Sequence, residues 1–296
     1  IHINFPFKVS IDCGNGVTGS IAKKIFSAFK VDTYIINENV DGNFPNHPPD
    51  TSNEKNLMQL KREIKKNGSG IGFAYDGDGD RIVVVKSNGD IVWPDQLLIL
   101  FSRNILKNNK NAKIVYDIKC TKFLEEEIIK NNGKPILSRT GHSFIKKAMI
   151  KEKAMLGGEM SGHIFFADKW DGFDDGIYAS IRLLEILSDN ENYEEILNDL
   201  PLSVTTPEIN IPFSGNNHFT FMRLFAKLTK FDDASVIDID GLKIIYPDGW
   251  ALIRCSNTSS SLVLRFEADS KSNLDRIQSI IKMNMLVIDK SIKIPF

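Results

Sequence analysis

Three aspartates alternate with glycines in the segment Asp76-Gly-Asp78-Gly-Asp80-Arg81, which follows the apolar run Ile71–Tyr75. Three carboxylates this close together repel one another unless a cation lies among them, and carboxylate oxygens are ligands that Mg²⁺ prefers. The intervening glycines allow the backbone to curl around a small ion. The segment therefore predicts a Mg²⁺ site with Asp76, Asp78 and Asp80 as ligands.

Three other interpretations of this segment compete with the metal site. An EF-hand loop needs Gly at its sixth position and Glu at its twelfth, where this chain has Arg81 and Ser87, so that interpretation is excluded. A phosphatase of the haloacid dehalogenase type, with Asp76 as nucleophile, stays open because its first Asp also follows an apolar strand. A solvated acidic turn is the remaining alternative.

A second polar segment, Gly158–His163, follows another predicted strand. Glu159 could accept hydrogen bonds from two sugar hydroxyls, while Ser161 and His163 could donate nearby. Lys119 and the segment Thr140–His142 could add a cation and further hydrogen bonds. The alternative for each of these segments is a solvated loop.

A third segment, Arg254-Cys-Ser-Asn-Thr258, joins two predicted strands. A guanidinium, two hydroxyls, an amide and the N–H groups of a tight turn together suit a phosphate group. Because Ser, Asn and Thr are also common turn residues, a polar hairpin turn is the alternative.

The segment Gly14–Gly19 satisfies the GxGxxG pattern after a strand, and Glu38 lies about 20 residues further on, as in dinucleotide sites. Small residues also simply allow a tight turn from strand into helix. We interpret this segment as such a turn. A dehydrogenase that binds a dinucleotide here is the weaker alternative.

Alternating strands and helices place these motifs in two α/β domains, 1–92 and 93–203, with parallel, helix-covered sheets. From about residue 204 strands dominate, which predicts an α+β domain over 204–296. The expected strands are 7–13, 32–36, 71–75, 83–86, 91–93, 113–116, 135–138, 154–157, 205–212 and several between 236 and 268. The first expected helix follows the glycine turn and ends near residue 29. The other expected helices cover 53–66, 94–106, 121–131, 143–151, 175–187, 193–200, 219–230 and 274–287.

Composition narrows the class of protein. The 296 residues carry 37 basic and 38 acidic side chains, a balance that argues against nucleic-acid and membrane-surface proteins. No apolar stretch approaches the roughly 18 residues of a membrane span. Three widely separated cysteines favour a reducing compartment, and we expect the cytoplasm. Because the chain opens with Ile1 just before a core strand, we expect that an upstream segment has been cut off, with a natural short protein as the alternative.

Together and in this order, the segments resemble the α-D-phosphohexomutases, especially the bacterial bifunctional phosphomannomutase/phosphoglucomutase branch. The resemblance implies two α/β domains and a C-terminal α+β, TBP-like domain around a central cleft. It covers essentially the whole chain. The matching segments are Asp12–Gly16, Val40–His47, Tyr75–Arg81, Thr140–Lys147, Gly158–His163, Phe173–Tyr178, Thr206–Asn210 and Arg254–Thr258.

The resemblance also implies an activity, the reversible interconversion of hexose 1-phosphate and hexose 6-phosphate through a hexose 1,6-bisphosphate that acts as activator. Mg²⁺ would bind the three aspartates, and Arg81 would stabilise the transferring phosphoryl group. His142 would be a candidate general acid or base. The implied substrate-binding residues are Lys119, His142, Glu159, Met160, Ser161, Gly162, His163, Arg254, Cys255, Ser256, Asn257 and Thr258.

The chain departs from the family pattern in two places. No Ser-His-Asn-Pro-like serine loop occurs in it, so we expect the family's phosphoserine to lie in a missing N-terminal domain of the same protein. Such a chain would be inactive alone but would keep metal affinity and weak phosphosugar affinity. Ser260 and Ser261 replace the Glu or Pro more usual in relatives, which should loosen the preceding loop. We expect a monomer, and we keep a non-catalytic sugar-phosphate binding protein as an alternative.

Overall fold

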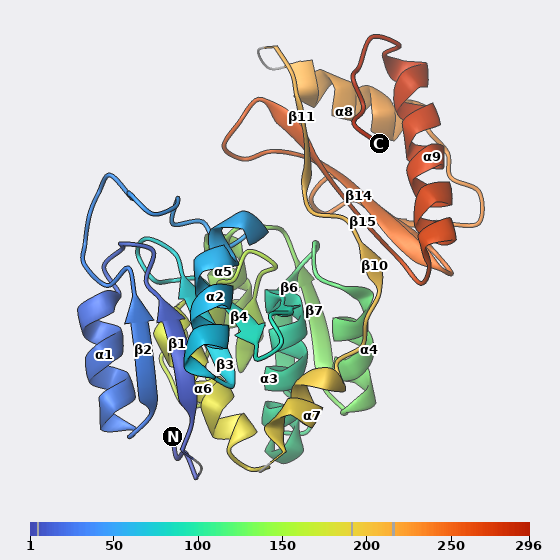
Figure 1. Cartoon of the computed structure of the whole chain (residues 1–296). Coiled ribbons are helices and arrows are strands. Elements are labelled where there is room, and N and C mark those ends of the chain that lie inside the picture. Colours follow the sequence, from blue (N-terminus) through green and yellow to red (C-terminus); the bar gives the residue numbers. More distant parts are fainter. Residues whose placement is uncertain (5, 191, 215–216) are drawn as a thin grey trace. The chain divides into compact units, whose positions relative to one another are not determined.

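The computed structural model describes residues 1–4, 6–190, 192–214 and 217–296. Contacts group the chain into two compact units, Ile1–Pro201 and Leu202–Phe296, and each is described by itself (Figure 1). Two sheets that follow one another in sequence are found in the first unit. The division of the chain at 92/93 and 203/204 stays a prediction.

The first sheet has the strand order β2-β1-β3-β4-β5. β1 (Lys8–Asp12) pairs in parallel with both β2 (Asp32–Ile36) and β3 (Ile71–Tyr75), as the alternation with helices predicted. Every residue of β3 is buried, which explains its uninterrupted apolar sequence. The carboxyl ends of these strands therefore meet at one edge, where the aspartates follow β3.

The rest of this sheet is antiparallel, so the sheet as a whole is mixed. β4 (Ile82–Lys86) pairs antiparallel with β3, and β5 (Ile91–Val92) pairs antiparallel with β4. The physical reason is the short connections, because a parallel crossover needs a dozen or more residues. The turn between β4 and β5 uses Gly89, whose φ is +91°.

The second sheet has the order β7-β6-β8-β9. β6 (Lys113–Asp117) runs parallel to β7 (Lys134–Ser138) and β8 (Leu156–Gly158). The sequence did not predict β9 (Ile164–Phe166), which pairs antiparallel with β8 across a five-residue turn. Three residues are too few to show a strand pattern, although all three are buried.

One apolar core joins the two sheets of the first unit. Side chains of β1, β3 and β4 belong to the same buried cluster as those of β6 and β8. Helices α3 (Pro94–Asn108) and α6 (Gly176–Leu187) supply much of this cluster, and α6 contacts β3, β4 and β9. Both sheets are therefore anchored to shared helices. The other helices of this unit are α1 (Gly19–Ala28), the 3₁₀ helix η1 (Glu54–Leu57), α2 (Met58–Asn67), α4 (Lys122–Lys130), α5 (His142–Glu152) and α7 (Tyr193–Asn198).

The second unit is an antiparallel sheet covered on one face by two helices, as expected for an α+β domain (Figure 1). The predicted strand 205–212 is split in two, because its ends pair with different parts of β15 and Pro207 between them cannot donate to a ladder. The strands are β10 (Val204–Thr205), β11 (Ile209–Pro212), β12 (Ser235–Ile237), β13 (Leu242–Tyr246), β14 (Gly249–Cys255) and β15 (Ser261–Ala268), and the helices are α8 (Asn217–Leu228) and α9 (Lys271–Ile288).

Two expectations from composition can be compared with the structure. Cys13, Cys120 and Cys255 are free thiols. Within the described ranges, none of the helices combines the length and apolarity that crossing a bilayer requires.

Candidate active site

The aspartate loop, residues 76–81, begins where the buried strand β3 ends. Asp76 is fully buried, and its Oδ1 accepts hydrogen bonds from the N–H groups of Gly79 (3.2 Å) and Arg81 (3.1 Å). This carboxylate therefore closes the loop on itself. Gly79 has a φ of +82°, and a Cβ there would lie 2.2 Å from Thr18 Cγ2, so the turn requires glycine.

The carboxylates of this loop lie close enough to share a cation. Arg81 Nε donates to Asp76 Oδ2 (2.5 Å) and lies 3.8 Å from Asp80 Oδ1. One oxygen each of Asp76, Asp78 and Asp80 lies within 4.8 Å of the others. Burial raises the pKa of Asp76 to about 6, although Arg81 opposes the rise. A donor set made only of oxygens, with one carboxylate desolvated, fits a hard divalent cation that would offset this cost.

The Gly14–Gly19 turn braces the aspartate loop and leaves little to bind a dinucleotide. Val17 N donates to Gly77 O (2.9 Å), and Gly16 N donates to Cys13 O (2.8 Å). A Cβ on Gly16 would lie only 2.3 Å from Gly77 O. These amides, which would have to hold a pyrophosphate, are already used within the protein. The glycines serve close backbone packing, as the turn interpretation predicted.

The second motif forms a tight turn between β8 and β9, called here the Glu159 turn (Glu159–His163). Glu159 N donates to His163 O (3.0 Å), and Gly162 adopts a φ of +108°. Ile82 N donates to Gly162 O (3.2 Å), and Arg81 forms an isolated β-bridge with His163. Backbone hydrogen bonding thus joins the Glu159 turn to the end of the aspartate loop.

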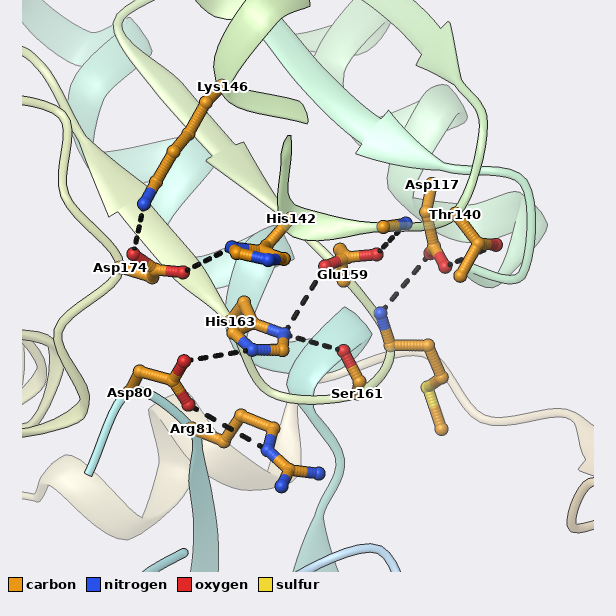
Figure 2. A network of polar contacts seen from close by, with 12 residues as sticks. Asp80, Arg81, Asp117, Thr140, His142, Lys146, Glu159, Ser161, His163 and Asp174 are labelled. Carbon is orange, nitrogen blue, oxygen red and sulfur yellow. Dashed lines mark hydrogen bonds and ion pairs between the residues drawn. The ribbon is translucent and has the colours of Figure 1, made fainter. Parts of the chain in front are cut away.

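His163 extends this connection through its side chain (Figure 2). Nε2 lies 3.2 Å from Asp80 Oδ2, while Nδ1 lies 3.2 Å from Glu159 Oε2 and 2.9 Å from Ser161 Oγ. Burial disfavours the charged ring, but the bonds to Asp80 and Glu159 outweigh it and raise the pKa of His163 to about 9. His163 is therefore an imidazolium at neutral pH. One ligand atom each of Asp80, His163 and Asp174 also lies within 4.8 Å of the others, but a protonated ring cannot ligate a metal, so the oxygen set of Asp76, Asp78 and Asp80 fits a hard cation better.

Glu159, predicted to bind sugar hydroxyls, is held firmly. It is 1% exposed, and its Oε1 accepts a hydrogen bond from Gly141 N (2.6 Å). Its other oxygen faces His163. A carboxylate has about four acceptor positions, so this anchoring leaves acceptor capacity for a ligand.

His142 is brought to the same site by helix α5, of which it is the first residue. Its ring stacks on that of His163, with centroids 5.6 Å apart and planes inclined by 21°. Nδ1 lies 3.5 Å from Asp174 Oδ2, and Lys146 Nζ lies 2.7 Å from Asp174 Oδ1. Asp174 and Lys146 were not predicted as site residues, although the resemblance had included both segments.

Asp117 is a second residue that the sequence did not single out. It is fully buried at the end of β6, and burial raises its pKa. It accepts hydrogen bonds from Met160 N (3.2 Å) and Thr140 Oγ1 (3.3 Å), and its Oδ2 lies 3.9 Å from Lys119 Nζ. One carboxylate thus connects three predicted site segments. Its position at the carboxyl end of a strand was the available signal.

The predicted phosphate segment lies in the second unit, at the turn after β14. Arg254 pairs with Asp240, with Nε 3.0 Å and Nη2 3.4 Å from its two oxygens. Ser256 Oγ accepts hydrogen bonds from the N–H groups of Thr258 (3.3 Å) and Ser259 (3.2 Å). Asn257 and Thr258 are exposed, whereas Cys255 is half-buried. The turn presents hydroxyl and amide groups, and its guanidinium already has a carboxylate partner.

The chain is similar in sequence to known proteins. The chain matches family models described as phosphoglucomutase/phosphomannomutase alpha/beta/alpha domain II (residues 3–89), alpha/beta/alpha domain III (93–203) and C-terminal domain (208–282). It is 45% identical over 290 residues to a phosphomannomutase/phosphoglucomutase of Pseudomonas syringae pv. tomato, covering 98% of this chain and 62% of that protein. It is 47% identical over 285 residues to a phosphoglucomutase of Neisseria meningitidis serogroup A, covering 95% and 62% respectively.

A solved structure shows the same fold. The crystal structure of a phosphoglucomutase/phosphomannomutase family protein from Burkholderia thailandensis superposes with a TM-score of 0.95 at 41% identity. The match covers 100% of this chain and 64% of that one, so the chain spans a little under two thirds of the relatives it matches. The ordered domain matches, together with this likeness, show that the chain belongs to the phosphoglucomutase/phosphomannomutase family.

Proposed function

We propose that this chain supplies the cation-binding, sugar-binding and phosphate-binding parts of a phosphohexomutase that interconverts hexose 1-phosphates and hexose 6-phosphates. The observation that carries the proposal is the connection made by His163. It links the aspartate loop, suited to phosphoryl chemistry, with Glu159, suited to sugar hydroxyls, inside one folded unit. The family names of the relatives support the same activity.

In this proposal the aspartate loop acts on the phosphoryl group. Asp76, Asp78 and Asp80 would hold Mg²⁺, which when bound supplies positive charge to phosphoryl oxygens. Arg81 lies beside the same carboxylates, and its guanidinium can neutralise charge that develops on the transferring group. Asp76 also keeps the loop closed through its bonds to backbone N–H groups.

The Glu159 turn and His142 act on the sugar. Glu159 accepts hydrogen bonds from ring hydroxyls, and Ser161, Gly162 and Met160 shape the turn around them. His142, with an exposed ring edge, takes the proton from the hydroxyl whose oxygen bonds to phosphorus, and later returns it. His163 stays protonated between its two carboxylates and stabilises negative charge there.

The segment 254–258 would hold a phosphate group of the substrate. Within the first unit, Lys119 would add a cationic substrate contact of its own. Arg254, fixed by Asp240, offers its remaining N–H groups, while Ser256, Asn257 and Thr258 add hydroxyl, amide and backbone donors. The phosphoryl donor would be the family's phosphoserine, whose oxygen is the leaving group, and a hexose 1,6-bisphosphate would restore it. The 296-residue chain alone should therefore bind phosphosugar weakly without turnover.

The rival phosphatase mechanism is disfavoured by the same geometry. A nucleophilic Asp76 must turn one oxygen toward phosphorus, yet Oδ1 accepts two backbone N–H groups and Oδ2 is bound by Arg81. Its side chain is also fully buried. Asp76 is better placed to organise the loop than to attack a substrate.

A coupled assay on the full-length protein tests the proposal with glucose 1-phosphate and mannose 1-phosphate. We expect Asp78→Asn to lower kcat by about 100-fold or more. Arg254→Lys should mainly raise KM, because lysine cannot keep the two contacts that the guanidinium makes with Asp240. Arg223→Lys, at an exposed position of helix α8, is the matched control and should match wild type. Phosphosugar binding without turnover in the full-length protein would instead indicate the non-catalytic binding protein.

A further inference from the structure

The carboxylate of Asp174 is held in a fixed position beside the site. Asp174 lies in the loop between β9 and α6, and its backbone forms an isolated β-bridge with Phe165. Its side chain is 9% exposed, and Oδ1 pairs with Lys146 Nζ at 2.7 Å. Lys146 follows His142 by one helical turn on α5, so both side chains project from one face of the helix. Asp174 is thus held in place by its backbone bridge and by the ammonium group of Lys146.

The second oxygen of this carboxylate faces His142 (Figure 2). Oδ2 is shielded from solvent and has no hydrogen-bond donor among the described residues. A potential donor, His142 Nδ1, lies 3.5 Å away. A buried acceptor without a donor is costly, so a small rotation of the ring that completes this bond is favourable.

Stacking restricts what the His142 ring can do. It lies over the ring of His163, whose two nitrogens are already engaged by Asp80 and by Glu159 with Ser161. The plane of His142 is therefore set, and what remains variable is which nitrogen faces Asp174. The side chain of His142 is 57% exposed, so the opposite edge of the ring is open to a ligand.

We propose that Asp174, held by Lys146, is a positioning residue that keeps His142 Nδ1 protonated and directs Nε2 toward the substrate. Naming the substrate rests on the proposed function, whereas the orientation of the ring does not. Under the simpler alternative, Lys146 and Asp174 form a surface ion pair that stabilises little and leaves the tautomer of His142 unaffected.

Nuclear magnetic resonance on the ¹⁵N-histidine-labelled chain tests the orientation without any turnover. Long-range ¹H–¹⁵N correlations are recorded at a pH where the imidazole is neutral, and the His142 signals are assigned with His142→Gln. We expect the Nδ1–H tautomer in the wild type. In Asp174→Asn the new amide can donate to Nδ1, so the tautomer population of His142 should shift toward Nε2–H. Asp174→Glu keeps a carboxylate and should not cause this shift.

Matched controls separate positioning from general damage. Asp171→Asn changes an exposed carboxylate in the same loop, and Lys147→Met changes the exposed lysine next to Lys146. Both should keep the wild-type tautomer, whereas Lys146→Met should give a mixture. Circular dichroism melts check that each variant is folded. An unchanged tautomer in folded Asp174→Asn, or Nε2–H in the wild type, would overturn the proposal.

Kinetics of the full-length protein give a second readout. Asp174→Asn should lower kcat by roughly 10–100-fold with KM changed less than about twofold, a typical cost for losing an outer partner of a functional histidine. Asp174→Glu should restore most of kcat. If the tautomer shifts but the full-length protein has no mutase activity, the positioning of His142 stands and the proposed function fails. Normal kcat in Asp174→Asn would overturn the positioning role.

Discussion

His163 Nε2 lies 3.2 Å from Asp80 Oδ2. The motifs to which these two residues belong are far apart in the sequence, because three of the four strands of the second sheet lie between them. The adjacent backbones are also bonded, through Gly162 O and Ile82 N. The position of the aspartate-loop carboxylates is therefore coupled to the position of Glu159. A disturbance at either motif should reach the other.

The first prediction concerns His163 itself. Replacing it with alanine removes the imidazolium that pairs with both Glu159 and Asp80. The side chain of Glu159 is 2% exposed, whereas Asp80 is less buried. We expect the free energy of unfolding to fall by about 1–3 kcal/mol, less than for a fully buried pair because Asp80 is partly solvated. Chemical denaturation measures it. His2→Ala, at an exposed position, is the control, and equal stability of both variants would contradict the coupling.

The second prediction concerns cation binding. Mg²⁺ should bind the 296-residue chain, and Asp78→Asn should weaken it by at least roughly tenfold, because an exposed ligand is lost without disturbing the loop closure by Asp76. Isothermal titration calorimetry measures the affinity. Asp90→Asn alters an exposed carboxylate in the β4–β5 turn and should bind Mg²⁺ as the wild type does. Equal affinity in both variants would rule out the aspartate site.

The third prediction concerns the glycine turn. A Cβ at Gly16 would lie 2.3 Å from Gly77 O, so Gly16→Ala must displace backbone of the aspartate loop. We expect a loss of about 1–3 kcal/mol in the free energy of unfolding and weaker Mg²⁺ binding. Gly42→Ala is the matched control, because no atom lies within 4 Å of its Cβ position. If Gly16→Ala bound Mg²⁺ normally, the turn would not brace the loop.

The fourth prediction concerns pH. His47 Nε2 lies 3.1 Å from the buried carboxylate of Asp12, and this hydrogen bond raises the pKa of His47 above its usual 6.5. A raised pKa in the folded state stabilises the protein fully below about pH 6.5 and loses this contribution as pH rises through the folded pKa. The stability difference between wild type and His47→Asn should therefore shrink as the pH rises above about 6.5. A difference that grows with pH in denaturation curves would contradict this.

Much of the fold was predictable because its strands are long, apolar and bounded by clear turns. β2 and β3 have the predicted bounds, and α3 begins at Pro94 as its sequence indicated. The sequence did not reveal β9, which has only three residues. It also did not reveal the split near Pro207, because pairing with β15 determines where β10 ends and β11 begins. Short strands depend on tertiary partners more than on local pattern.

The candidate site was predictable where chemistry is concentrated in one short segment. The three aspartates and Glu159 stood out because their residue types and glycine neighbours are unusual. Asp117 and Asp174 did not, because a single aspartate at the end of a strand or in a loop is common. Their importance comes from what the fold brings to them: Met160 N and Thr140 Oγ1 in one case, Lys146 and His142 in the other.

The most direct measurement is ³¹P nuclear magnetic resonance of the full-length protein with glucose 1-phosphate, Mg²⁺ and a catalytic amount of glucose 1,6-bisphosphate. The proposed function predicts that the 1-phosphate signal is replaced by a 6-phosphate signal, that no inorganic phosphate accumulates, and that Asp78→Asn slows the change by about 100-fold or more. Release of inorganic phosphate, or an unchanged spectrum from folded, Mg²⁺-bound protein, would contradict it.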